Sequence, residues 1–297
     1  MTPPDAAAFA AADAAIPLAD RPYPRGFLAS LRKYGRICRA SLVERLTYRV
    51  DFMLGILFRF LPMLTTILLW KAIYAGASSD RINGFSYREM IAYLLLTNIS
   101  RMFSSMPGLA GGVARDIRDG AIKRYLIQPI DMIGYLVAYR IAHKISYIIT
   151  SAVPYAILFW ICRDNFDGLP DPLTLLAWFA SLVMAFVVGF FFEVSVGMVG
   201  FWIGEVTSIL YIVMTLNFFI SGHMLPLDLL PEPWFRILTL LPFQYMAYFP
   251  AVVFQGKIHG PALAWGLAGQ FAWAVAFILI ARGLFRLGLR RYSAFGG

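Results

Sequence analysis

The sequence predicts an all-α membrane protein with six transmembrane helices. Of its 297 residues, 60% are hydrophobic and 14% are charged, whereas soluble globular proteins average about 25% charged residues. The mean hydropathy is +0.68. Several apolar stretches approach or exceed the roughly 20 residues that a helix needs to cross the hydrocarbon core of a bilayer. Together these observations argue against a soluble globular domain.

Lysines and arginines are concentrated in segments predicted to lie on one side of the membrane. They cluster in residues 25–49, 115–144 and 282–291, whereas the loops predicted on the other side carry only scattered ones, such as Arg81 and Lys257. Because segments rich in these residues stay in the cytoplasm, both termini are predicted to be cytoplasmic. This topology and anionic lipid headgroups explain the net charge of +9, so no nucleic-acid partner is expected.

The N-terminal region predicts a tail followed by an interface helix. Residues 1–26 are rich in Ala and Pro and lack the basic start and apolar core of a signal peptide, so we expect a disordered cytoplasmic tail. In residues 27–49, apolar and basic positions alternate at helical spacing. This pattern predicts an amphipathic helix in the cytoplasmic interface, with an ordinary solvated helix as the alternative. Residues 27–297 are expected to form a single transmembrane domain.

Six apolar segments are long enough to be the predicted spans. Polar segments that contain Gly or Pro separate most of them. The third helix has an apolar continuation back to about Ile133, which would project it into the cytoplasm. The spans are expected at about residues 52–74, 87–110, 145–162, 174–200, 206–225 and 261–284.

Residues 226–260 are apolar and aromatic but contain too many prolines for a span. Pro226, Pro231, Pro233, Pro242 and Pro250 divide this segment, and no piece between them is long enough to cross the bilayer. We expect two short amphipathic helices that re-enter the outer leaflet. Irregular backbone at that depth must be covered by protein or line a cavity, so the segment is a candidate outer gate.

Motifs for catalysis are missing from the sequence. It has no Gly-x-x-x-x-Gly-Lys-Ser/Thr phosphate loop and no Gly-x-Ser-x-Gly nucleophile motif. His143, His223 and His259 are scattered and lack the spacing of metal ligands. We therefore do not expect an enzyme, a bound cofactor or a metal site in this chain.

The cytoplasmic segment at residues 113–128 has the pattern of a short amphipathic helix. Val113, Ile117, Ala121 and Tyr125 recur every four residues, and Pro129 would end the helix because it cannot donate a backbone hydrogen bond. A charged helix with an apolar ridge suits docking into a groove of another protein. A solvated connector explains the same periodicity equally well.

The run in which Gly120, Leu126 and Pro129 follow a basic segment resembles the coupling-helix region of type-2 ATP-binding-cassette (ABC) exporter permeases. Residues 220–226 resemble the segment that closes the fifth span in that family. The order of elements is also similar, with an interface helix, six spans, a coupling helix after span two and a re-entrant outer hairpin. The resemblance covers nearly everything after about residue 25. Tyr125 stands where the family often has Leu.

The resemblance implies a permease domain that works with partners. Cytoplasmic ABC ATPase subunits would hold ATP-Mg, so this chain itself would bind no cofactor. A second permease copy would complete the path as a homodimer or a related heterodimer, surrounded by membrane lipids. The location would be a bacterial inner (plasma) membrane, which the protein crosses several times. The expected ATPase-coupling residues are Asp116, Arg118, Asp119, Gly120, Lys123, Arg124, Tyr125, Leu126 and Pro129.

Polar residues inside the predicted spans are further candidates. They are Arg59, Asn98, Arg101, Glu193 and Asn217. An unpaired charge inside a span costs about 2.5–3.5 kcal/mol. We therefore predict that Glu193 pairs with Arg59 or Arg101, although both arginines could instead snorkel to the inner headgroups.

Other candidates lie at the outer end and at the ends of the spans. The candidate outer-gate residues are Gly222, His223, Pro226 and Trp234. The glycine pairs Gly108/Gly112 and Gly200/Gly204 fit either helix packing or tight turns.

The function expected from this resemblance is export of an amphipathic substrate, such as a lipid, glycan-lipid or drug-like molecule, driven by ATP hydrolysis on the partner. An ion-gradient-driven secondary transporter is the first alternative and would require coupling-ion ligands in discontinuous spans. An intramembrane enzyme is the second alternative. It would require His, Asp or Glu groups that converge at one depth.

Overall fold

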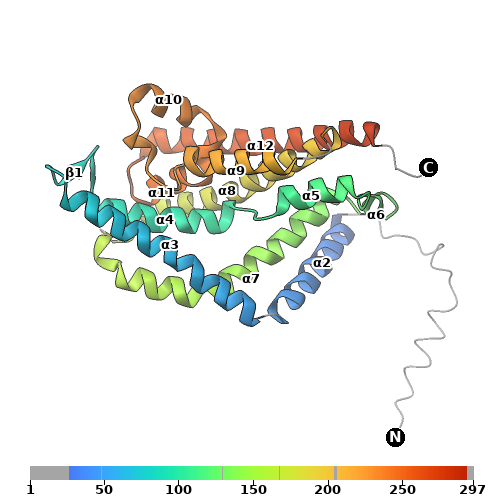
Figure 1. Ribbon diagram of the computed structural model, residues 1–297, viewed down its shortest axis with the longest axis horizontal. Coiled ribbons are helices and arrows are strands. Elements are labelled where there is room, and N and C mark those ends of the chain that lie inside the picture. The colour runs from blue at the N-terminus through green and yellow to red at the C-terminus, as the bar shows by residue number, and fades with distance from the viewer. Residues whose placement is uncertain (1–26, 48, 129, 167, 204–205, 293–297) are drawn as a thin grey trace, which may run out of the picture.

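The computed structural model describes residues 27–47, 49–128, 130–166, 168–203 and 206–292, with side chains from 32 to 43 and from 61 onward. The predicted tail at residues 1–26 lies outside the described residues. The described chain is almost entirely helical (Figure 1). The α-helices are α2 (Phe27–Thr47), α3 (Arg49–Ala75), α4 (Tyr87–Ser104), α5 (Leu109–Arg118), α6 (Lys123–Leu126), α7 (Met132–Ile161), α8 (Pro172–Met198), α9 (Thr207–Ile220), α10 (Glu232–Leu240), α11 (Tyr248–Phe254) and α12 (Gly260–Arg291).

Short elements join these helices. A two-stranded antiparallel hairpin of β1 (Arg81–Ile82) and β2 (Phe85–Ser86) precedes α4. The short 3-10 helices are η2 (Arg163–Asn165), η3 (Val199–Phe201), η4 (Leu227–Leu229) and η5 (Pro242–Met246).

Among the described residues, three helices are long and apolar enough to cross a bilayer: α7, α12 and α8 with its continuation to Phe201. Shorter apolar helices run from Leu61 to Ala75 within α3 and over α9. The chain is therefore an all-α membrane protein, as the sequence predicted. The count of six spans stays a prediction.

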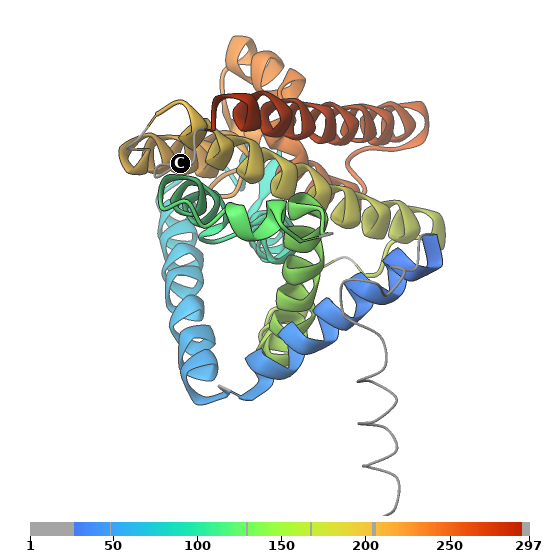
Figure 2. The same cartoon turned by 90° about the vertical axis from the view of Figure 1, so that its right-hand side faces the viewer.

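Helix α8 is the centre of the bundle. It packs against α4, α5, α11 and α12, and it has many fully buried side chains, such as Phe190 and Val194. Figure 2, which views the molecule along its long axis, shows α12 and α8 on one side and α2 and α3 on the other. Helix α2 packs along α7. The predicted interface helix at residues 27–49 thus exists as a helix, and it ends at Thr47.

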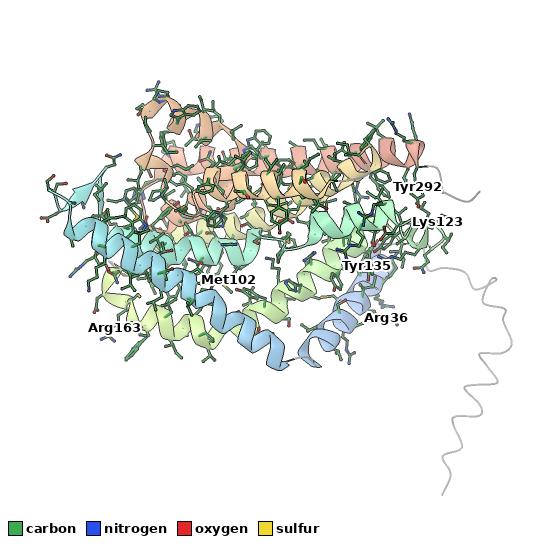
Figure 3. All side chains as sticks on the ribbon, viewed as in Figure 1. Arg36, Met102, Lys123, Tyr135, Arg163 and Tyr292 are labelled. Atoms are coloured by element: carbon green, nitrogen blue, oxygen red, sulfur yellow. The ribbon has the colours of Figure 1, made fainter. Side chains whose placement is uncertain are left out.

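Residues from two of the predicted basic clusters lie at the same end of the molecule. Figure 3 places Arg36, Lys123 and Tyr292 at one end and Arg163 at the other. Helix α6 and the C-terminal end of α12 share the first end, whereas β1 lies at the second end (Figure 1). We call them the basic end and the outer end.

Two predicted helices are each divided in two. Span two was expected to continue to Ala110, but α4 ends at Ser104 and α5 begins at Leu109 after Gly108, which has a φ of 74°. The coupling helix was expected to run unbroken over residues 113–128. Instead α5 ends at Arg118, and a turn with Gly120 at a φ of 75° leads into α6. Glycine adopts this left-handed conformation without the penalty that a Cβ brings.

The outer segment contains the two short helices that the prolines predicted. Helix α10 has no buried residue, whereas residues 248–253 of α11 are all buried against α4 and α8. The irregular backbone before α11, at residues 244–247, is also buried, whereas Lys257 and His259 after it are exposed. The third helix begins at Met132, next to the early start predicted near Ile133, and its projection into the cytoplasm stays a prediction.

Candidate functional site

The interruption at residues 105–108, called here the α4–α5 break, lies next to charged side chains from two other helices. Lys144 of α7 donates hydrogen bonds from Nζ to the carbonyl oxygens of Met102, at 2.6 Å, and of Ser105. Arg140 Nη1, one turn earlier, donates to the carbonyl oxygen of Pro107 at 3.1 Å. Unsatisfied backbone groups cost several kcal/mol in an apolar environment. These cations therefore stabilise the break.

Glu193 of α8 also forms a hydrogen bond with the backbone of the α4–α5 break. The residue is 7% exposed, and its Oε1 accepts a hydrogen bond from the Met106 amide at 3.1 Å. The sequence predicted a pairing with Arg59 or Arg101. Within the described side chains the carboxylate bonds to the freed amide instead of to Arg101, because the break brings that amide closer. The side chain of Arg59 lies outside the described residues, so that pairing stays a prediction.

Glycines on α8 and on η3, which continues it, allow α5 to approach closely. A Cβ at Gly197 would lie 2.6 Å from the carbonyl oxygen of Ala110, and one at Gly200 would lie 3.2 Å from Ala114 Cα. Gly200 therefore serves helix packing. Gly108 serves a turn, since its φ is 74° and the space around it is open. Gly112 is also in open space, and Gly204 lies outside the described residues.

Two cavities meet beside the break. The larger has a volume of about 680 Å³ and lies between α4, α5, α8 and α9. The smaller has a volume of about 360 Å³ and lies between α3, α4 and α7. Met102, which lines the smaller cavity, lies near the middle of the long axis in Figure 3. The residues that line both cavities are Arg101, Ser105, Pro107, Phe218 and His223.

The structure brings together most of the polar residues predicted inside the spans. Arg101, Glu193 and Asn217 line the larger cavity, and Asn98 lines the smaller one. The Asn98 amide also donates to the carbonyl oxygen of Leu94 in its own helix at 2.8 Å. The Arg101 guanidinium lies over the ring of Phe218, with Cζ 5.2 Å from the ring centroid.

The predicted outer-gate residues divide into a buried group and an exposed one. Gly222 has a φ of 80°, and a Cβ there would lie 2.8 Å from the hydroxyl oxygen of Tyr93, which donates to the Gly222 carbonyl. The His223 ring stacks on Phe218, with centroids 5.7 Å apart. Pro226 is buried directly before η4. Trp234 is 60% exposed on α10 and does not join this junction, because α10 lies on the surface.

The predicted coupling residues occupy the basic end. Asp116 and Arg124 form an ion pair at 2.6 Å, and Arg118 and Asp119 form another at 3.1 Å. Lys123 is exposed. Leu126 and Ile127 are 47% and 82% exposed, and we call these two residues the α6 tip. Pro129 lies outside the described residues.

Tyr125 is a buried member of the predicted coupling residues. Its ring centroid lies 5.5 Å from that of Tyr135 on α7. Tyr125 thus joins α6 to α7, and its role in coupling stays a prediction. Val113 and Ile117 of the predicted apolar ridge are also buried.

An ion pair that the sequence analysis missed lies beside α6. Asp131 caps α7 by accepting from the Gly134 amide at 2.8 Å, and it binds Arg282 of α12 through two hydrogen bonds of 2.6 and 2.9 Å. Burial alone would raise the pKa of Asp131. The hydrogen bonds from Arg282 and Gly134, with the charges of Arg282 and Lys33, hold the pKa below its ordinary value. An Asp directly before an apolar helix can be recognised from the sequence as a helix cap. Its ion pair with the distant Arg282 cannot be recognised in this way.

The span-length helices α7 and α8 each line one of two cavities that combine apolar and charged side chains, and such intramembrane polar groups mark functional sites in helical membrane proteins. Among the described residues, no group of three or more His, Cys, Asp or Glu side chains could hold a metal ion. The family described as ABC-2 family transporter protein matches residues 60–296. The chain therefore belongs to this family and is a type-2 ABC permease, which confirms the resemblance. A search of curated proteins found no match.

Family membership favours the ABC permease among the three functional classes that the sequence left open. A type-2 ABC permease is the membrane subunit of a transporter that works with ABC ATPase subunits. This membership argues against the secondary transporter and the intramembrane enzyme.

Proposed function

We propose that this permease couples ATP hydrolysis on separate cytoplasmic ATPase subunits to export of an amphipathic substrate from the cytoplasm or the inner leaflet. One observation carries the proposal. Helix α5 contributes Ala110, Gly111 and Ala114 to the wall of the larger cavity, and it continues through one turn into the exposed α6 tip. Displacement of the tip by a partner would therefore act directly on the cavity wall.

The α6 tip has the composition of a docking surface. Two exposed aliphatic side chains lie next to Lys123 and Arg124. Apolar anchors supply most of the affinity of such contacts, whereas charges around them supply orientation and association rate. Because Asp116 and Arg124 already pair with one another, they would contribute less to docking than Leu126 and Ile127.

Rigid contacts would transmit motion from this surface. Tyr125 is packed against Tyr135 at the start of α7, and Asp131 joins that start to α12. Helix α5 is held tightly against Gly197 of α8 and Gly200 of η3. The α4–α5 break is where the backbone leaves the helical conformation at the start of α5, so a hinge there would let α5 move relative to α4.

The cavities fit an amphipathic substrate. Small-molecule sites have volumes of about 300–1,000 Å³ and combine apolar walls with few polar groups. The larger cavity has about 680 Å³ and places Phe192, Leu210 and Met214 together with Arg101. We further propose six spans, both termini in the cytoplasm, a second permease copy and a location in a bacterial inner membrane.

Co-purification with an ATPase tests the proposal. The permease is co-expressed with candidate ABC ATPase subunits, and the amount retained on the tagged permease is measured. The double variant Leu126→Glu/Ile127→Glu should lose the ATPase. Leu169→Glu is the matched control, because Leu169 is 83% exposed at the outer end. Transport by the purified permease alone, without any ATPase, would contradict the proposal.

A further inference from the structure

The wall shared by the two cavities carries polar atoms that the fold does not use. Ser104 Oγ, Asn217 Oδ1 and His223 Nε2 are buried and have no hydrogen-bond partner among the described residues. All three residues line the larger cavity, and His223 lines the smaller one as well. Buried polar atoms without a partner cost free energy, so the Ser104 hydroxyl and the His223 ring nitrogen at a cavity wall indicate a ligand that pairs with them, whereas Asn217 Oδ1 can only accept.

The hydrogen-bonding role that His223 presents to the cavities depends on its tautomer. Its Nδ1 lies 2.7 Å from Ser221 Oγ, while the Ser221 hydroxyl is 3.5 Å from the carbonyl oxygen of Phe218. A neutral imidazole has one donor nitrogen and one acceptor nitrogen. When the Ser221 hydroxyl donates to Nδ1, Nε2 carries the proton, and an anionic ligand at Nε2 favours this tautomer.

The charge around these atoms is predominantly positive. Arg101 lines both cavities, Arg115 and Arg118 line the larger one, and Lys144 lines the smaller one. Glu193 is the acidic side chain among the described lining residues, and its Oε1 accepts from the Met106 amide. Hydrogen bonds between charged partners are stronger than neutral ones, particularly away from bulk water.

We propose that this wall binds the anionic headgroup, a phosphate or carboxylate, of the transported amphiphile. Arg101 supplies the countercharge, and the Nε2–H of His223 and the hydroxyl of Ser104 donate hydrogen bonds to the headgroup oxygens. The apolar tail lies along Leu210 and Met214 of α9. The inference rests on the proposed function, to which it adds the charge of the substrate.

Direct binding tests this inference. The full-length permease in dodecyl maltoside is titrated with fluorescent probes that share one dansyl-labelled alkyl tail and carry phosphate, carboxylate, trimethylammonium or glucoside headgroups. Fluorescence anisotropy reports binding. We expect both anionic probes to bind at least about tenfold more tightly than the cationic probe. Arg101→Gln should remove this preference, Arg101→Lys should retain part of it, and Arg101→Glu should reverse it.

Control measurements separate a specific loss from misfolding. The Arg101 variants should still bind the glucoside probe and elute like the unaltered protein. Arg163→Gln makes the same charge change at the outer end and should keep the preference. His223→Phe retains a stacking ring but loses the Nε2 donor, and it should weaken anionic binding without reversing the preference.

Competition distinguishes the sources of the headgroup. Displacement of the phosphate probe by dioleoyl phosphatidic acid indicates a membrane lipid, and displacement by unlabelled alkyl phosphate alone indicates a single-chain amphiphile. Displacement by inorganic phosphate at the same concentration overturns the amphiphile assignment. Equal binding of cationic and anionic probes overturns the inference itself. ATPase co-purification is unaffected by these outcomes and tests the permease role separately.

Discussion

Lys144 on α7 donates a hydrogen bond to the carbonyl oxygen of Met102 on α4 across a distance of 2.6 Å. The contact joins residues that are 42 positions apart in the sequence. It places an ammonium group against the end of a helix, where unpaired carbonyl oxygens carry partial negative charge. With Glu193 on the other side, it makes a helix interruption possible inside an apolar bundle.

Replacing Lys144 by Met should destabilise the protein by about 1–3 kcal/mol, because the carbonyl oxygens of Met102 and Ser105 would stay buried without a charged donor. The measurement is thermal unfolding in detergent. Lys71→Met is the control, since Lys71 is an exposed cation on α3. Equal melting temperatures for the two variants would contradict the role assigned to Lys144.

The two variants Glu193→Gln and Glu193→Leu should differ. The Gln carbonyl oxygen can still accept from the Met106 amide, so folding and transport should change little. Leu removes the acceptor and should cost about 1–3 kcal/mol of stability. Retained assembly and transport in Glu193→Gln would show that an ion pair with an arginine has no functional weight. If Gln destabilises the protein as much as Leu, the negative charge matters more than the hydrogen bond.

Gly222→Ala and Gly108→Ala separate crowding from backbone strain. Both glycines have positive φ angles, 80° and 74°, and this conformation costs roughly 1–2 kcal/mol for residues with a Cβ. At Gly222 the new methyl group would also meet Tyr93 and Tyr248 at 2.8 Å, whereas the space at Gly108 is open. Gly222→Ala should therefore give the larger loss of melting temperature, and the reverse order would refute this explanation.

Asp131→Asn should reduce stability at neutral pH but not at strongly acidic pH. Because the folded pKa of Asp131 is lowered, its contribution is fully present above the unfolded pKa and is lost as the pH falls through the folded one. The difference in unfolding free energy between the two proteins should be constant above about pH 5 and shrink below about pH 4. A difference that grows on acidification would reverse the assigned sign.

Asp116→Asn should change stability by about 1 kcal/mol or less, since ion pairs with exposed partners contribute little, and the Arg124 side chain is 55% exposed. ATPase co-purification should stay near the level of the unaltered protein, in contrast to the α6 tip variant. Complete loss of the ATPase would move the main docking role from Leu126 and Ile127 to this charge pair.

Much of the fold follows from local patterns. The apolar segments, the prolines at residues 226–250 and the basic clusters predicted the helices, the interrupted outer segment and the segregation of basic residues to one end. The start of α7 was also visible, because its apolar pattern continues back to Ile133. The turn at Gly120 and the break before Gly108 were missed. A helical periodicity continues across both sites, and a glycine in the sequence does not reveal the φ that it adopts.

The candidate site, like the fold, was predicted only in part from the sequence. By itself the sequence predicted a helical membrane permease with the polar residues Arg101, Glu193 and Asn217 inside apolar segments, where the bilayer penalises unpaired charges. Only the tertiary structure decided their partners. Glu193 bonds to a freed amide, Lys144 to freed carbonyls, and Asp131 to Arg282, since each contact depends on where separate helices cross and not on spacing along one helix.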